Sequence, residues 1–219
     1  MSDWEQFCAE VTWFLEDGQT AVTGAPAPWT RAPIAALPEL SELLRSATLT
    51  PVSVAGEDYE LLAWGPADDR RGWLCRPPRE AGDDAVTDAH QAFWQVCGGL
   101  IETFGAPTTW WENQDQVLTI DAVRLEVANF LIDYGWIWAN DGLEVPIDAG
   151  DYYAAAVEAN GNLTLAHRKD GRLLLFAPDH AFDGVTPLPG CPPYSLLTID
   201  AVPDLITWIE VCAAAWREA

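Results

Sequence analysis

The sequence predicts an α+β fold in which a central, mostly antiparallel sheet is flanked by helices. Three observations support this class. Residues 151–176 contain three short apolar runs that are separated by Asn160-Gly161 and Asp170-Gly171. Such pairs favour two-residue hairpin turns, because glycine has no Cβ and Asn or Asp tolerates a positive φ. Apolar residues at helical spacing occupy both ends of the chain, and residues 51–75 contain three further strand-like runs.

Two helices are expected in the N-terminal part of the chain. Ser2 and Glu5 form a capping box, and the apolar residues that follow recur at helical spacing as far as Asp17-Gly18. This pattern predicts a first helix that ends at Asp17-Gly18. Leucines between residues 37 and 44 predict a second, short helix.

A small antiparallel sheet is expected to follow these helices. Turn residues separate three apolar runs, at residues 51–55, 59–64 and 73–75. The polar, Pro-containing residues 77–84 then predict a boundary. We therefore expect an N-terminal extension of helices and small sheet at residues 1–80, and an α+β unit at residues 81–219. The alternative is that the extension and this unit form one domain.

The middle of the chain is expected to alternate between helix and strand. Thr87 caps a helical pattern that extends to Phe104. Gly98-Gly99 would weaken that helix by about 2 kcal/mol relative to alanines, which predicts close packing or a break there. A strand is predicted at residues 116–120 and a helix near residues 121–134. The next aromatic residues predict a strand that enters a turn, and they are Tyr134, Trp136 and Trp138.

The last part of the chain is expected to form a loop and a closing helix. Residues 177–193 are rich in Gly and Pro and predict an ordered loop. Asp200 is expected to cap the last helix, with Pro203 in its first turn. One apolar face of this helix comprises Leu205, Ile206, Ile209, Cys212, Ala213 and Trp216.

The charge of the chain limits its partners. Its 34 acids and 11 bases give a net charge of −23, and Lys169 is the single lysine. Residues 81–166 carry 14 acids and one base, Arg124. A surface of this charge repels nucleic acid and anionic membranes and attracts a basic partner. The plainer alternative is that the acids only keep the protein soluble.

The N-terminus and the cysteines indicate a cytoplasmic protein. The first ten residues carry acids where a secretory signal would carry positive charge, and no apolar run approaches the roughly 20 residues that span a bilayer. The five cysteines are odd in number and contain no C-x-x-C pair. We therefore expect buried free thiols, with neither a disulfide framework nor a metal site.

Three motifs have both a chemical and a structural interpretation. Asp179-His180 resembles a catalytic pair, but a structural role is favoured because no nucleophile motif accompanies it. The alternating oxygen ligands from Glu158 to Asn162 resemble part of a calcium loop, although a hairpin explains them better. Four arginines near Trp73 could bind phosphate or bases, but counter-charges to carboxylates are the simpler interpretation. We expect no catalytic residue, metal or cofactor.

The segment FWQVCGGL at residues 93–100 precedes Tyr152-Tyr153, the hairpin EANGNLTLAHRKDGRLLLFAPDH at residues 158–180, and a helix that ends in Trp216. In combination, these features resemble the SUKH superfamily, a group of bacterial immunity proteins related to yeast cell-wall-synthesis regulators. The resemblance covers about residues 86–217. It implies an α+β fold and the binding and neutralisation of a toxin, often a nuclease or deaminase, without catalytic residues.

We therefore expect a non-enzymatic immunity protein that binds a basic toxin domain through an acidic face bearing aromatic residues. The alternatives are a cytosolic adaptor with the same fold and, less favoured, an enzyme that uses Asp179 and His180. The residues expected to bind the partner are Glu112, Asp115, Asp133, Asp141, Glu144, Asp148 and Asp151, with Trp111 and Trp138 as anchors. Core packing is the alternative for the aromatic residues.

Overall fold

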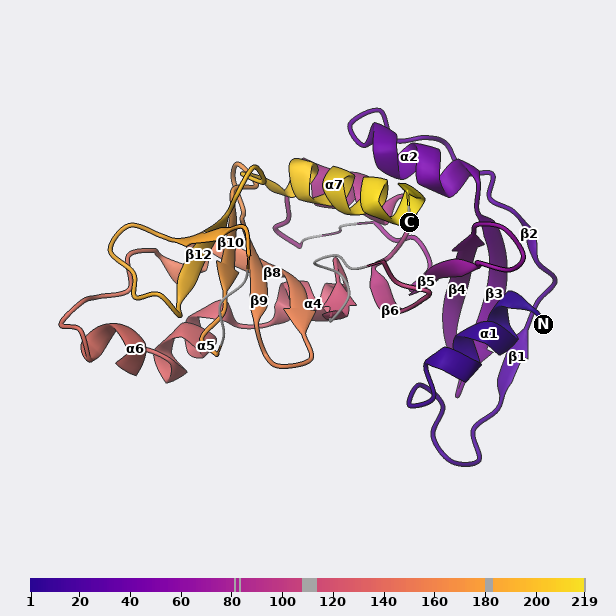
Figure 1. The fold of residues 1–219 in the computed structure, drawn as a ribbon, viewed down its shortest axis with the longest axis horizontal. Helices are drawn as coiled ribbons and strands as arrows, with labels where there is room; N and C mark the ends of the chain where they lie inside the picture. The colour runs from indigo at the N-terminus through magenta and orange to yellow at the C-terminus, as the bar shows by residue number, and fades with distance from the viewer. Residues whose placement is uncertain (81, 83, 108–113, 180–182, 219) are drawn as a thin grey trace.

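The computed structural model describes residues 1–80, 82, 84–107, 114–179 and 183–218. It confirms the predicted α+β class, because 12 strands form one sheet with helices packed against it (Figure 1). The strand order is β1-β3-β4-β5-β6-β7-β8-β9-β10-β12-β11, and β2 also pairs with β3. Every pairing between these described strands is antiparallel.

The strands are β1 (Ala21–Thr23), β2 (Ala27–Pro28), β3 (Thr48–Val54), β4 (Glu57–Trp64), β5 (Arg71–Cys75), β6 (Leu100–Phe104), β7 (Gln114–Val117), β8 (Tyr152–Glu158), β9 (Leu163–His167), β10 (Leu173–Phe176), β11 (Val185–Pro187) and β12 (Leu196–Ile199). The helices are α1 (Asp3–Glu10), α2 (Pro38–Arg45), α3 (Asp88–Trp94), α4 (Ile120–Arg124), α5 (Val127–Asp133), α6 (Trp136–Ala139) and α7 (Leu205–Glu218), with a 3₁₀ turn η1 at Ala149–Asp151.

The N-terminal elements follow the sequence expectation, with one correction. Ser2 and Glu5 form the predicted capping box of α1, and β3, β4 and β5 form the predicted small sheet. The helix ends at Glu10 and does not continue to Asp17-Gly18. Tertiary contacts decide this end, because the ring of Phe14 turns back to meet the edges of Phe7 and Tyr59.

The helix predicted from Thr87 to Phe104 is shorter than expected. Thr87 caps α3, which ends at Trp94, and the chain re-enters the sheet as β6. The helix ends before the two glycines, and the close packing predicted there is confirmed. A Cβ on Gly98 would stand 2.1 Å from the carbonyl oxygen of Pro77, and Gly99 has a φ of +113°. Because β6 pairs with β5, the sheet continues across the proposed boundary at residues 77–84, and that boundary stays a prediction.

Two short helices replace the single helix predicted near residues 121–134. Leu125 adopts an extended ψ of 129° and separates α4 from α5. The strand predicted at residues 116–120 is β7, which ends at Val117 because Leu118 takes a φ of +55° and Thr119 caps α4. The strand predicted for the aromatic residues after Tyr134 is also wrong, since they form α6.

The C-terminal meander of β8, β9 and β10 is confirmed, but its turns are longer than predicted. Only the glycines of the two pairs have positive φ, 89° at Gly161 and 72° at Gly171. Asp204 caps α7 instead of Asp200, because its carboxylate accepts a hydrogen bond from the backbone N–H of Thr207 at 2.8 Å. Asp200 instead accepts a hydrogen bond from the Thr186 hydroxyl.

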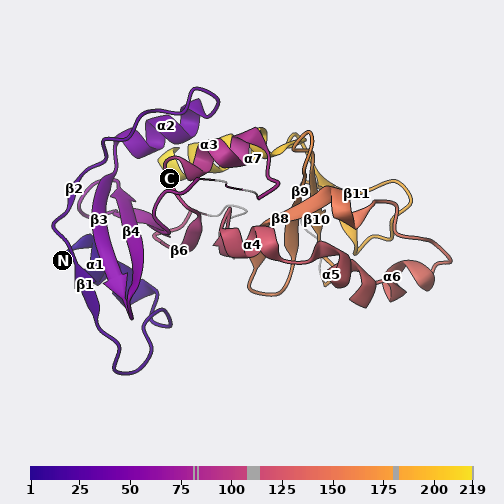
Figure 2. The same cartoon turned by 180° about the vertical axis from the view of Figure 1, so that it is seen from behind.

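Three apolar clusters stabilise the sheet. Phe7 of α1 packs on the N-terminal strands, and α5 and α6 pack on the C-terminal strands. The largest cluster lies between them, where α7 contacts α2 and α3. The two views in Figures 1 and 2 show α7 over the middle of an elongated molecule, between the N-terminal and C-terminal halves of the sheet.

Candidate protein-binding surface

A contiguous acidic segment borders the C-terminal half of the sheet. It comprises α5, α6 and the loop that leads through η1 to β8, and we call residues 127–151 the acidic ridge. In Figures 1 and 2, α5 and α6 follow one another along one border of the molecule. The ridge contains five acids and no base.

The inner side of the ridge is fixed by aromatic packing on Phe176 of β10. Phe130 and Tyr134 stack on each other, and both meet the ring of Phe176 edge-on at centroid distances of 6.0 and 5.3 Å. Trp138 stacks on the same ring, and its indole Nε1 donates to Cys191 Sγ at 3.4 Å. These contacts turn one side of α5 and α6 toward the sheet.

Three large apolar side chains of the ridge are exposed to solvent. Ile132 is 74% exposed, Trp136 is 59% exposed and Leu143 is 40% exposed. Ile132 and Trp136 are four residues apart, the spacing of neighbours on a helix surface. A hydrogen bond from the Gly135 backbone N–H to the Ile132 carbonyl forms a helix-like turn between them. Large apolar side chains that are exposed together are a common sign of an interaction surface.

Five of the sequence-predicted binding residues lie on the ridge, and all five are exposed. They are Asp133, Asp141, Glu144, Asp148 and Asp151. Asp148 accepts a hydrogen bond from the backbone N–H of Gly150, which orders η1. Among the described residues, none of the five forms an ion pair, so their charge is presented to solvent.

The other four predicted residues are not exposed side chains of the ridge as far as the structure describes them. Asp115 is exposed but lies on β7, and Trp111 and Glu112 lie outside the described residues. Trp138 is only 1% exposed, because its indole is needed to pack on Phe176, so it does not serve as a surface anchor. Trp136 occupies that position instead. The sequence analysis missed this difference because it predicted a strand, in which residues 136 and 138 point to the same side. In a helix they point to different sides.

Most basic side chains of the protein form ion pairs with carboxylates. Of the 11 basic residues, eight form ion pairs, namely Arg31, Arg45, Arg70, Arg71, Arg76, Arg79, Arg124 and Arg217. The arginines near Trp73 are therefore counter-charges, as the simpler interpretation held. The other three, Arg168, Lys169 and Arg172, form no ion pair in the described part of the chain, and all belong to the turn between β9 and β10.

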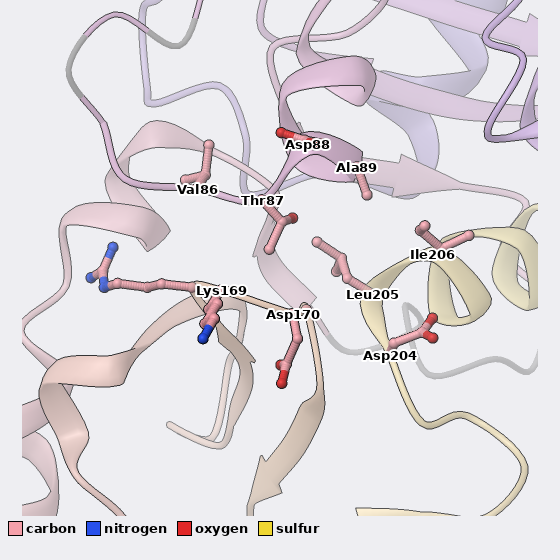
Figure 3. A pocket seen from close by; sticks show the side chains of 11 residues that line it. Val86, Thr87, Asp88, Ala89, Lys169, Asp170, Asp204, Leu205 and Ile206 are labelled. Atoms are coloured by element: carbon pink, nitrogen blue, oxygen red, sulfur yellow. The ribbon is translucent and has the colours of Figure 1, made fainter.

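A hollow of about 250 Å³ lies where α3, α7 and the β9–β10 turn meet (Figure 3). Thr87, Ala89, Leu205 and Ile206 contribute to its wall. Figure 3 shows the charged ends of Asp88, Lys169, Asp170 and Asp204 spread around the rim, and they do not converge on one point. The hollow therefore lacks the convergent polar groups that a catalytic or ligand site requires.

Other motifs resolve into structural roles where the structure describes them. Asn162 donates to Glu158 within the β8–β9 hairpin, which supports the hairpin interpretation over a calcium loop. No cluster of three or more metal-ligating residues occurs among the described residues. The five cysteines are free thiols, but only Cys75, Cys97 and Cys212 are buried as predicted, whereas Cys8 and Cys191 are partly exposed. Asp179 is exposed, while His180 lies outside the described residues, so that pair stays a hypothesis.

Comparisons with known proteins provide no relative for this chain: no family model, no curated protein and no solved structure matches it. The fold and the ridge define the chain as an α+β protein that presents an acidic surface with exposed apolar side chains. Within the described residues, no helix combines the length and apolar content that a bilayer crossing requires.

Proposed function

We propose that this chain is a non-enzymatic immunity protein of the SUKH type, which binds and neutralises a basic toxin domain through the acidic ridge. The ridge is the observation that carries the proposal. It combines five exposed carboxylates, which form no ion pair with any described residue, with three exposed apolar side chains on a scaffold fixed to Phe176.

The chemistry of the ridge selects the partner. Unpaired carboxylates attract a basic surface over distances up to the Debye length, about 8 Å at physiological salt, and accelerate association. A large exposed aromatic side chain slows dissociation when a pocket on the partner covers it. Nucleases and other enzymes that act on nucleic acid carry basic surfaces where phosphates bind, so an acidic ridge can occupy such a surface.

The test is copurification with the product of the adjacent gene, together with rescue of cells that express that product. We expect Trp136→Ala to weaken binding about tenfold or more and to abolish rescue. Tryptophans that become buried against a partner are typical anchors of interfaces. Trp13→Ala is the matched control, because Trp13 is 69% exposed but lies in the N-terminal part of the chain. It should bind and rescue like the wild type.

Two results would overturn the proposal. One is failure of the wild-type protein both to bind the adjacent gene product at low salt and to rescue the cells. The other is equal binding by the Trp136→Ala and wild-type proteins, which would exclude the ridge as the contact surface.

A further inference from the structure

A second hollow, of about 310 Å³, lies on the C-terminal half of the sheet, separate from the one in Figure 3. Tyr152 of β8 and Leu174 of β10 contribute to it, and so does Arg172, which directly precedes β10. Its apolar walls come from Pro146, Ile147, Leu174, Leu188 and Pro189. The volume is at the lower end of the range of roughly 300–1,000 Å³ that is usual for small-molecule sites.

Two polar side chains meet in this apolar hollow. Arg172 Nη2 donates to the Tyr152 hydroxyl oxygen at 2.9 Å, which holds the guanidinium in one orientation. In the described part of the chain, no carboxylate forms an ion pair with the Arg172 guanidinium, and its Nε and Nη1 groups form no hydrogen bond. The nearby Asp170 carboxylate accepts a hydrogen bond from the Arg172 backbone N–H, and this bond and the Arg172 charge lower the pKa of Asp170. The Tyr152 proton likewise finds no acceptor among the described residues. Three hydrogen-bond donors are therefore available beside apolar walls.

That no described carboxylate forms an ion pair with the Arg172 guanidinium is significant because the chain carries 34 acids. Eight other basic side chains are each paired with one of them. The tyrosine ring is also held in place, since His167 packs edge-on against it at a centroid distance of 5.1 Å. A guanidinium that is oriented, positively charged and unpaired is suited to bidentate binding of a carboxylate.

We propose that this hollow binds a small carboxylate with an apolar body. The two oxygens of the ligand accept hydrogen bonds from Arg172 and Tyr152, and its hydrocarbon part lies against Ile147, Leu174 and Leu188. The acidic ridge supplies one wall through Pro146 and Ile147, but the site does not depend on a protein partner. The hollow binds an anion, whereas the ridge attracts positively charged groups.

Octanoate is the probe, and octanamide is its neutral match. In a calorimetric and ¹⁵N NMR titration of the full chain, we expect saturable binding of one octanoate, with shift changes centred on Arg172, Tyr152 and Leu174. Octanamide should bind about tenfold more weakly or worse, because a charge-assisted bidentate contact is lost. Arg172→Gln should remove this preference, while Arg45→Gln, on the distant α2, should retain it.

The proposal fails if wild-type protein binds octanoate and octanamide equally, if no saturable binding occurs at millimolar concentrations, or if the shift changes lie elsewhere. Thermal unfolding and the NMR spectrum establish whether Arg172→Gln is folded. Should that variant not fold, the comparison of the two ligands on the wild-type protein still decides the outcome. Loss of toxin binding by ridge variants would not affect this result.

Discussion

At the residue scale, His90 is a fully buried titratable group that joins distant elements of the fold. Its Nε2 lies 3.0 Å from the Leu118 carbonyl, and its Nδ1 lies 3.1 Å from the Tyr153 hydroxyl. A carbonyl can only accept a hydrogen bond, so Nε2 carries the proton and Nδ1 accepts from Tyr153. This neutral tautomer satisfies both ring nitrogens and connects α3 to the chain around β7 and β8.

Burial lowers the pKa of His90 from 6.5 to about 4, because the charged form is poorly solvated there. Between these two values the unfolded chain binds a proton that the folded chain does not, so stability must fall as pH decreases from 6.5 to 4. At pH 5 this loss is on the order of 2 kcal/mol. Urea unfolding at pH 7 and pH 5 should show a smaller loss for His90→Gln than for the wild type.

Glu102 also titrates in this window, and the comparison between the two proteins separates its contribution from that of His90. Burial raises the pKa of Glu102, which favours the folded state at lower pH, whereas hydrogen bonding lowers the pKa of Asp170 from its ordinary value of 3.8, so Asp170 titrates below the window. Both contributions are present in each protein. Equal pH dependence of the wild type and His90→Gln would contradict the assignment.

The N-terminus of α2 is capped by α7, which is a feature of the element scale. Leu37 provides no side-chain cap to α2, and Pro38 has no N–H. The carboxylate of Glu210 accepts hydrogen bonds from the backbone N–H groups of Glu39 and Leu40, at 2.8 and 3.2 Å. One side chain of α7 therefore performs the function that Ser2 performs for α1, but across 170 residues of sequence.

Glu210→Ala should destabilise the fold by about 1–2 kcal/mol, because two backbone donors lose their acceptor. Glu210→Gln keeps one acceptor oxygen and should cost less. Glu218→Ala, at the exposed end of the same helix, is the control and should stay within about 0.5 kcal/mol of the wild type. Chemical denaturation measures all three. A Glu210→Ala protein as stable as the Glu218→Ala control would show that the cap does not contribute.

At the scale of the whole molecule, charge is distributed unevenly between paired and unpaired groups. Acids of the N-terminal part neutralise several arginines, as in the Arg70–Asp3 pair at 2.7 Å and the Arg31–Glu60 pair at 2.5 Å. Among the described residues, no arginine or lysine forms an ion pair with a ridge carboxylate. The ridge therefore carries the field that steers a basic protein, at one border of the elongated sheet.

Reversal of Asp133, Asp141 and Glu144 to lysine should slow association with a basic partner by about tenfold or more at low salt and flatten its dependence on ionic strength. The control reverses three exposed acids outside the ridge, Asp17, Asp68 and Glu218, and changes the net charge equally. Stopped-flow association at several salt concentrations measures both. If the two triple variants slowed association equally, total charge and not the ridge would steer the partner.

Part of the fold and of the site was predictable from the sequence because the signals are local. Ser2 with Glu5, Thr87 at the start of α3, and the glycines of the meander act within four residues, and each has the predicted role. Composition also predicted the excess of acid between residues 81 and 166. Five of the nine expected binding residues, all of them acids, lie exposed on the ridge.

The elements that only the tertiary structure decided depend on distant contacts. The close packing at Gly98 follows from the approach of Pro77, and the end of α1 follows from the packing of Phe14 on Tyr59. Trp136 and Trp138 are equally apolar in sequence, but Phe176 lies beneath one of them and not the other, so one is buried and one is exposed. A sequence pattern specifies which residues prefer burial, whereas the contacts between distant elements decide which of them the core has room to cover.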